Sequence, residues 1–213
     1  MWKTILSTNN IKYFQDVEKQ IIHNCGEKSY QHIFIFHKGR DGDRIGHTEI
    51  MTIQELIEKA AELQISLSET QVKQLEQYAQ LLVEWNEKMN LTAITEHGEI
   101  LEKHFYDSIL PLGKGKIFGK VADIGTGAGF PGLVWKIVKP ELDVSLIEPT
   151  GKRCTFLQEV IDQLHLENIH VYNTRAEEQV KTDRELYDVV TARAVANLRV
   201  LSELCIPLVK VNG

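Results

Sequence analysis

The pattern of apolar positions divides the chain into two unlike parts. In the second part, short runs of consecutive apolar residues alternate with segments whose apolar residues recur every three or four positions. The runs predict four buried strands, at residues 121–124, 143–147, 169–172 and 188–192. The periodic segments predict helices at residues 132–138, 154–164 and 198 to about 209. This alternation is typical of an α/β fold with a parallel sheet and helices on both faces.

Residues 51–119 show helical periodicity and predict a helical cap region that precedes an α/β domain at residues 120–213. One helix is expected over residues 52–63. A second helix is expected to run to Met89, and its start is marked by Ser68 and Gln71, which have the spacing of a capping box. A third helix is predicted over residues 99–110. The glycine- and lysine-rich segment 113–119 is predicted to form a flexible hinge into the first strand.

Residues 1–50 do not share this pattern. The segment HIFIF, residues 32–36, predicts a strand, and KGRDGDRIG, residues 38–46, predicts a loop. Because regular helical periodicity begins at Met51, we expect residues 1–50 to be an extension outside the core, of unknown role and dispensable for folding. The alternative is that residues 32–36 cover an open edge of the sheet. Four histidines in this part are interpreted as solvated side chains, not metal ligands: His23, His32, His37 and His47.

A glycine-rich turn joins the first predicted strand to the following helix, in the segment VADIGTGAGFPG, residues 121–132. Gly125, Gly127 and Gly129 allow the backbone to turn sharply and to approach a ligand closely. Pro131 suits the first turn of a helix, where its missing N–H costs nothing. The helix N-terminus offers further unpaired N–H groups. The segment therefore predicts a loop that holds a nucleotide cofactor.

Two cofactors fit this loop. Gly127, Gly129 and Gly132 match the dinucleotide pattern G-x-G-x-x-G, which would indicate an NAD-dependent oxidoreductase. Gly125, Gly127 and Gly129, preceded by Asp123, match the acidic loop of methyltransferases that use S-adenosylmethionine. A carboxylate under the loop repels a pyrophosphate, whereas S-adenosylmethionine presents an ammonium group to it. We therefore favour S-adenosylmethionine and keep NAD as the alternative.

Further polar groups follow the other predicted strands. Glu148 ends the second strand and would accept hydrogen bonds from both ribose hydroxyls of an adenosine, a role that serves NAD equally well. Ala176 and Glu177 follow the third strand, and Arg193 follows the fourth. Because the carboxyl ends of parallel strands meet at one edge of a sheet, we expect these residues and the glycine loop to line one site.

Composition excludes several classes of protein. No apolar run approaches the roughly 20 residues that span a bilayer, so no membrane contact is expected. The three cysteines lack metal-ligand spacing and predict free thiols in a reducing cytoplasm. The net charge of −6 argues against RNA binding through overall charge, so any RNA contact needs a local basic patch. Candidates for that patch are Lys103, Lys114, Lys116, Lys120, Lys152 and Arg153.

Five segments, in chain order, resemble the bacterial glucose-inhibited division protein B family: VEWNEKMNLTAIT, KHFYDSI, DIGTGAGFPG, RAEE and YDVVTARAVA. The resemblance covers about residues 51–213. It implies a class I, Rossmann-like methyltransferase fold that uses S-adenosylmethionine. The implied substrate is N7 of a guanine in 16S ribosomal RNA, free or in the small ribosomal subunit. We expect the chain to be a cytoplasmic monomer. The cofactor contacts that it implies are Gly125, Phe130, Ala176, Glu177 and Arg193.

The implied reaction needs no acid or base. Guanine N7 has a lone pair and no proton, so alignment supplies most of the rate, roughly 7–11 kcal/mol. His104 and Asp107, on one face of the third predicted helix, are compatible with an acid–base pair or with ordinary helix packing. We predict no catalytic residue and no metal ligand. In this family the sheet continues with strands that would follow residue 213, so we expect the sheet of this chain to be incomplete. A further alternative is therefore a non-catalytic relic that binds the cofactor or the ribosome without turnover.

Overall fold

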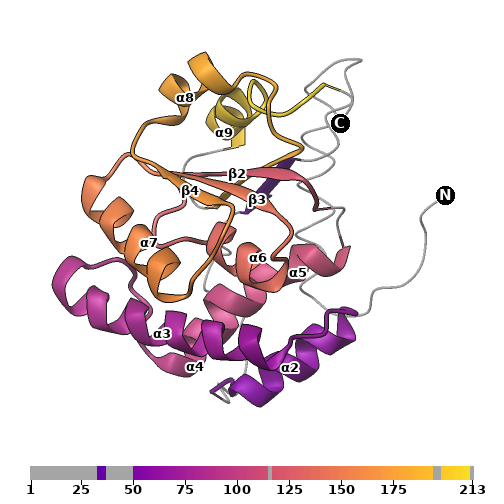
Figure 1. Cartoon of the computed structure of the whole chain (residues 1–213), viewed down its shortest axis with the longest axis vertical. Helices are drawn as coiled ribbons and strands as arrows, with labels where there is room; N and C mark the ends of the chain where they lie inside the picture. The colour runs from indigo at the N-terminus through magenta and orange to yellow at the C-terminus, as the bar shows by residue number, and fades with distance from the viewer. Residues whose placement is uncertain (1–32, 37–49, 115–116, 194–197, 212–213) are drawn as a thin grey trace.

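The computed structural model describes residues 33–36, 50–114, 117–193 and 198–211, and the structural statements below concern these residues. Within them, five parallel strands form one sheet in the order β1-β5-β2-β3-β4. Helices α8 and α9 lie on one face of the sheet, and α3, α6 and α7 lie on the other (Figure 1). The predicted α/β class, with a parallel sheet and helices on both faces, is confirmed.

The four predicted strands are present almost as expected. They are β2 (Lys120–Ile124), β3 (Asp143–Ile147), β4 (Ile169–Tyr172) and β5 (Val189–Arg193). Successive side chains of a strand point to opposite faces of a sheet. Val121 and Val189 therefore pack into the larger core with α3, α6 and α7, whereas Ala122 and Val190 pack into a smaller core with α8 and α9. Both faces are buried, so the strand sequences are nearly continuous apolar runs.

The helices of the α/β domain are α6 (Gly132–Val138), α7 (Gly151–Gln163), α8 (Ala176–Asp183) and α9 (Leu198–Cys205). The apolar pattern does not predict α8. Its only buried residues are Ala176 and Gln179, so the helix has no apolar stripe that periodicity can detect. The predicted final helix is shorter than expected, because the chain leaves α9 after Cys205 and Tyr187 pairs with Val209 in an isolated bridge.

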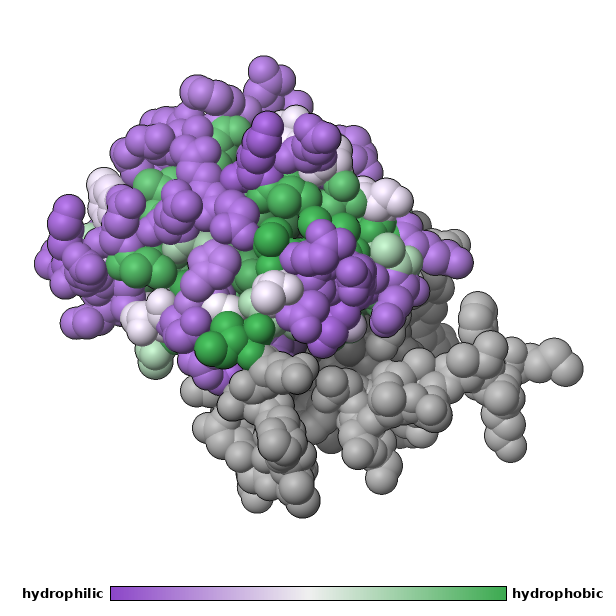
Figure 2. All heavy atoms as spheres, turned by 90° about the horizontal axis from the view of Figure 1, so that it is seen from below, coloured by the Kyte–Doolittle hydropathy of each residue, from purple (hydrophilic) through white to green (hydrophobic). Residues whose placement is uncertain are grey.

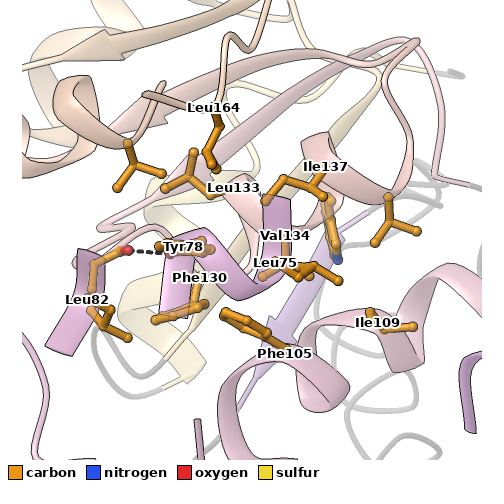
Figure 3. Close-up of a cluster of buried hydrophobic side chains, with 14 of the residues drawn as sticks. Leu75, Tyr78, Leu82, Phe105, Ile109, Phe130, Leu133, Val134, Ile137 and Leu164 are labelled. Carbon is orange, nitrogen blue, oxygen red and sulfur yellow. Dashed lines mark hydrogen bonds between the residues drawn. The ribbon is translucent and has the colours of Figure 1, made fainter. Parts of the chain in front are cut away.

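The cap region forms α2 (Ile53–Glu62) and α3 (Glu69–Met89). The predicted capping box is confirmed, since the Gln71 backbone N–H donates to Ser68 Oγ (3.3 Å) and the Ser68 N–H donates to Gln71 Oε1 (2.8 Å). Figure 2 shows the surface of the molecule on the side of the cap region. This surface is mainly hydrophilic, with apolar areas between the polar side chains. The buried faces of α3 and α6 contribute Tyr78 and Leu133 to the larger core (Figure 3).

The third predicted helix is present but irregular. It consists of α4 (His97–Ile100), the π-helical turn η1 (Leu101–Tyr106) and α5 (Asp107–Lys114). The predicted hinge is wrong at its start, because residues 113–114 complete α5. Ile117 is also buried in the larger core, which fixes the approach to β2. Residues 115 and 116 lie outside the described residues, so the remainder of the predicted hinge stays a prediction.

Strand β1 (Ile33–Phe36) lies at the edge of the sheet, parallel to β5, with Ile33 opposite Val190 and Phe36 opposite Arg193. The expectation that this segment lies outside the core is therefore wrong, and the alternative that it covers an open sheet edge is what the structure shows. Without β1, the edge of β5 would present unpaired backbone N–H and C=O groups. An extended segment can form hydrogen bonds with such groups even when it is distant along the chain. The division of the rest of the chain near residues 50 and 120 stays a prediction.

Deletion of residues 1–49 is now expected to lower the free energy of unfolding, because it removes β1 and exposes the edge of β5. Four paired residues, at about 1 kcal/mol net for each hydrogen bond, predict a loss of roughly 2–4 kcal/mol. Urea unfolding measures the change, and a chain that lacks only residues 1–30 keeps β1 and serves as the control. Equal midpoints for the two shortened chains would show that β1 does not contribute to the fold.

Candidate functional site

A cavity of about 510 Å³ lies at the carboxyl ends of the strands, where ligands bind in open α/β sheets. Small-molecule sites typically have volumes of roughly 300–1,000 Å³. The glycine loop after β2 lines the cavity. Glu148, Ala176 and Glu177 line one part of the wall, and we name the part formed by Leu91, Thr92 and His104 the cap end.

Most of the predicted site residues meet at this cavity. Those that line it are Gly125, Gly127, Phe130, Glu148, Ala176, Glu177 and Arg193. Asp123 and Gly129 do not line it. Asp123 is fully buried behind the loop, and Gly129, at the end of the loop, packs against Leu133 and Tyr78. Thr92, Thr126 and Arg175 also line the cavity and were not predicted from the sequence as site residues. Arg175 directly precedes Ala176 in the RAEE segment, and Thr92 lies in the NLTAIT segment. Both residues therefore lie in motifs that carry the resemblance to the family, and those motifs could have identified them.

The glycine loop is tied to β3 by its backbone. Gly125 N–H and Thr126 N–H both donate to the carbonyl oxygen of Ile147, at 2.8 and 3.3 Å. Gly127 has a φ of +62°, and a Cβ atom built there would meet nothing closer than the Gly125 carbonyl oxygen at 4.0 Å. The open space at Gly127 belongs to the cavity, so the loop presents bare backbone to a ligand.

Asp123 anchors the loop. Its Oδ2 atom accepts hydrogen bonds from the Gly132 backbone N–H (2.8 Å) and from Thr126 Oγ1 (2.6 Å). Burial raises the pKa of Asp123 to about 6, although both of these hydrogen bonds act to lower it. The expected position facing a ligand's ammonium group is not what the structure shows. Asp123 instead holds the start of α6 against the end of β2.

Glu148 combines full burial with access to the cavity. Only 1% of the residue is exposed, and its carboxylate accepts the Gly127 N–H through Oε2 (3.0 Å) and the Thr150 N–H through Oε1 (2.9 Å). Arg153 Nη1 lies 3.8 Å from Oε1. A carboxylate has about four lone-pair positions, so each oxygen can accept a further hydrogen bond. This fits the predicted role of binding two ribose hydroxyls.

A stacked group joins the glycine loop to the cap end and consists of Phe130, His104 and Arg193. The His104 ring stacks on the Phe130 ring at 4.4 Å between centroids, and the Arg193 guanidinium lies 5.0 Å from the Phe130 centroid. Arg193 Nη2 bonds to His104 Nδ1 (2.7 Å), and Thr92 Oγ1 bonds to His104 Nε2 (2.9 Å). Both ring nitrogens are therefore engaged, and the structure does not support an acid–base pair of His104 with Asp107.

The environment of His104 keeps its ring neutral. Burial, followed by the positive charge of Arg193, lowers the pKa of His104 to about 3. The ring is therefore uncharged at neutral pH, and the lone pair of Nδ1 is occupied by Arg193. These features favour a role in positioning Arg193 and Thr92.

Lowering the pH from about 7.5 to about 5 is expected to reduce stability through His104. Its pKa is about 3 when folded against a model value of 6.5, so between these values the unfolded chain binds a proton that the folded chain does not. At pH 5 this costs about 2 kcal/mol. The raised pKa of Asp123 acts in the opposite direction, because the folded chain takes up its proton first as the pH falls.

The variant His104→Gln removes only the histidine contribution, so the difference between the two chains isolates it. Urea unfolding of both chains at the two pH values is the measurement. We expect the variant to lose less stability than the wild type as the pH falls. Equal losses would contradict the lowered pKa.

The predicted basic patch is only partly assembled. Lys152 is exposed at the start of α7 and Arg153 lines the cavity, whereas Lys103, next to His104, forms an ion pair with Glu99. Lys120 is the first residue of β2, and its Nζ atom lies 3.8 Å from Asp143 Oδ2. Because the cavity lies at the carboxyl ends of the strands, Lys120 is at the opposite edge of the sheet from it. Its inclusion in the patch is wrong. The side chains of residues 114 and 116 lie outside the described part of the chain.

Other chemistry receives no support from the part of the chain that the structure describes. It contains no group of three or more His, Cys, Asp or Glu side chains that could hold a metal ion. Cys154 and Cys205 are free thiols, whereas Cys25 and the four N-terminal histidines lie outside the described ranges. None of the described helices has the length and apolar character that a membrane span requires.

Comparisons with known proteins identify the family. A family model described as rRNA small subunit methyltransferase G matches residues 71–213. Ribosomal RNA small subunit methyltransferase G of Streptococcus sanguinis strain SK36 is 51% identical over 168 residues, which cover 76% of this chain and 71% of the relative. The protein of the same name from Streptococcus pneumoniae strain TIGR4 is 54% identical over 158 residues, which cover 72% of this chain and 67% of the relative.

Among solved structures, a precorrin-6y C5,15-methyltransferase from Geobacter metallireducens is 15% identical, with a TM-score of 0.43 over 50% of this chain and 58% of that one. The family match spans the glycine loop, Glu148 and Arg193, and the comparisons do not favour the NAD-dependent alternative. The resemblance found in the sequence motifs is confirmed. The chain belongs to the GidB family of small-subunit rRNA methyltransferases.

Proposed function

We propose that this chain transfers a methyl group from S-adenosylmethionine to N7 of a guanine in 16S ribosomal RNA. The observation that carries this proposal is the match of the family model over residues 71–213, which span the glycine loop, Glu148 and Arg193. The Glu148 carboxylate faces the glycine loop within the cavity and fits the ribose of a nucleoside cofactor. Membership of a family whose members are named for methylation of small-subunit rRNA supports both the reaction and the substrate. A ribosomal RNA substrate also agrees with the predicted cytoplasmic location.

The residues of the cavity fit S-adenosylmethionine. Glu148 would accept the ribose hydroxyls, and the Gly127 backbone leaves open space beside them. Ala176 has a small side chain that leaves room for the adenine, with Glu177 as a hydrogen-bond acceptor next to it. Arg193 has five N–H donors, of which the contacts with His104 and with the Lys103 carbonyl oxygen use two, so it can also bind the carboxylate of the methionine part. When bound, this cofactor supplies an electrophilic methyl group on its sulfonium sulfur.

The remaining task of the chain is to align the acceptor. Guanine N7 attacks through a lone pair and loses no proton, so no general base is needed. His104 agrees with this, because it is neutral and both of its ring nitrogens are engaged. Alignment of two bound reactants can contribute roughly 7–11 kcal/mol to the lowering of the barrier. We assign that alignment to the rigid contacts among Phe130, His104 and Arg193.

RNA phosphates would contact basic side chains at the border of the cavity. Arg153 and Arg175 line it, and Lys152 lies beside Arg153 on the first turn of α7. These local charges would offset the net charge of −6 of the whole chain. The acceptor is either free 16S rRNA or the small ribosomal subunit, and the chain is proposed to act as a monomer.

Mass spectrometry of 16S rRNA from cells that lack or contain this chain tests the proposal. We expect one 7-methylguanosine to be present only when the chain is present. Thermal unfolding tests the cofactor separately, since S-adenosylhomocysteine should raise the melting temperature and NAD should not. Stabilisation by S-adenosylhomocysteine without any change in the rRNA would support the non-catalytic alternative.

A further inference from the structure

Thr92 lies at the cap end of the cavity, in the turn that follows α3. Its backbone N–H donates to Asn86 Oδ1 (2.8 Å), and its side-chain oxygen accepts the backbone N–H of Ile94 (3.1 Å). Asn86 is itself buried in α3. These bonds hold the Thr92 side chain in one position relative to the cavity.

Hydrogen bonds around His104 determine which of its ring nitrogens is protonated. An arginine side chain has only donors, so His104 Nδ1 accepts the bond from Arg193 Nη2 (2.7 Å). A neutral imidazole then has its proton on Nε2, which lies 2.9 Å from Thr92 Oγ1. His104 therefore donates to Thr92.

The Thr92 oxygen thus accepts two hydrogen bonds, one from Ile94 and one from His104. A hydroxyl has two lone pairs, and both are used, so its own proton must point elsewhere. No residue in the described ranges accepts this proton. Because Thr92 lines the cavity, its hydroxyl is available as a hydrogen-bond donor to a ligand there.

Guanine and adenine differ at the atom next to N7. Guanine has two acceptors on this edge, N7 and O6, whereas adenine has the N7 acceptor beside an amino group that donates. A donor placed next to the reacting N7 therefore favours guanine. We propose that the Thr92 hydroxyl donates a hydrogen bond to O6 of the acceptor base and so selects guanine over adenine. This inference rests on the proposed function and names the residue that gives the site its base specificity.

Arg193 is less suited to this role. Arginine recognises guanine through paired bonds to O6 and N7, and such a pair would occupy the lone pair that must attack the methyl group. Arg193 is also held by His104 and by a longer contact of Nη1 with the carbonyl oxygen of Lys103 (3.5 Å). A single hydroxyl on O6 leaves N7 free to react.

The test begins with the wild-type chain. Mass spectrometry first maps the guanine that it methylates in unmodified 16S rRNA. That position is then occupied by guanine, inosine or 2-aminopurine in a fragment of the same RNA assembled by ligation. Inosine keeps O6 and N7, and 2-aminopurine keeps N7 but has no O6. In single-turnover assays we expect similar rates for guanine and inosine, and a rate about tenfold lower for 2-aminopurine.

Two variants assign the discrimination to Thr92. Thr92→Val removes the hydroxyl at constant shape, and Thr92→Ser keeps the hydroxyl. We expect Thr92→Val to lower the rate with guanine about tenfold and to methylate 2-aminopurine as fast as guanine. Thr92→Ser should keep the wild-type preference. Calorimetric affinity for S-adenosylmethionine reports whether each variant is folded.

The outcomes separate the two proposals. If the wild type methylates no guanine, the proposed function is rejected, and the role of Thr92 with it. If the wild type methylates guanine and 2-aminopurine equally fast, only the role of Thr92 is rejected, whether or not the variants fold. If Thr92→Val slows all three RNAs by the same factor, Thr92 acts only as a support for Ile94 and His104, and the assignment to O6 is wrong.

Discussion

Replacement of Glu148 by alanine is expected to weaken S-adenosylmethionine binding by at least about 100-fold. A hydrogen bond to a charged acceptor contributes roughly 1.5–3 kcal/mol, and the carboxylate is proposed to accept two from the ribose. Two such bonds correspond to about 3 kcal/mol or more, and every 1.4 kcal/mol is about a tenfold change in affinity. The loss is expected to be large because Glu148 is buried and held in place by the Gly127 and Thr150 amides.

Isothermal titration calorimetry of the wild type and of Glu148→Ala measures this loss. Glu148→Gln keeps one acceptor oxygen and should give an intermediate affinity. Glu141→Ala is the matched control, because Glu141 is exposed before β3, at the opposite edge of the sheet from the cavity, and its removal should leave the affinity unchanged. An unchanged affinity in a folded Glu148→Ala chain would show that the ribose assignment is wrong. Urea unfolding establishes that each variant is folded.

The variant Gly129→Ala is expected to destabilise the fold by roughly 2–6 kcal/mol. Gly129 has a φ of +101°, a conformation that costs other residues about 1–3 kcal/mol. A Cβ atom there would also collide with the Leu133 side chain and lie 2.7 Å from Tyr78 Oη. Tyr78 cannot easily move, because its hydroxyl donates to the Ala128 carbonyl oxygen (2.5 Å) and its ring stacks on Phe105 and Phe130 (Figure 3). Overpacking of this kind adds about 1–3 kcal/mol.

Urea unfolding of Gly129→Ala is the measurement, and Gly151→Ala is the control. Gly151 begins α7, and a Cβ atom there would meet only Asn173 Oδ1 at an ordinary 3.6 Å. The control is expected to change the free energy of unfolding by less than about 1 kcal/mol, since alanine is the better helix residue. Similar effects at both positions would contradict the close packing of the glycine loop on α3.

The sequence by itself determined the α/β domain and most of its site. The strands β2 to β5 are buried on both faces, so each one is an apolar run that periodicity detects without knowledge of its neighbours. The positions of Glu148, Ala176 and Arg193 then follow from topology, because parallel strands bring their carboxyl ends to one edge. The capping box at Ser68 was equally predictable, since both of its partners lie within four residues.

Only the tertiary structure decided what depends on contacts between distant segments. The pairing of β1 with β5 joins residues far apart in the chain, and the hydrogen bonds of a strand edge leave no mark in the sequence of either partner. The place of Asp123 behind the loop, facing α6, is likewise a consequence of packing.

The link from Thr92 through His104 to Arg193 also belongs to the tertiary structure, because it joins the cap region to the end of the sheet. Local patterns record which face of an element is buried. The direction of a hydrogen bond, and therefore the chemistry that a hydroxyl can offer, is fixed only when every partner is in place.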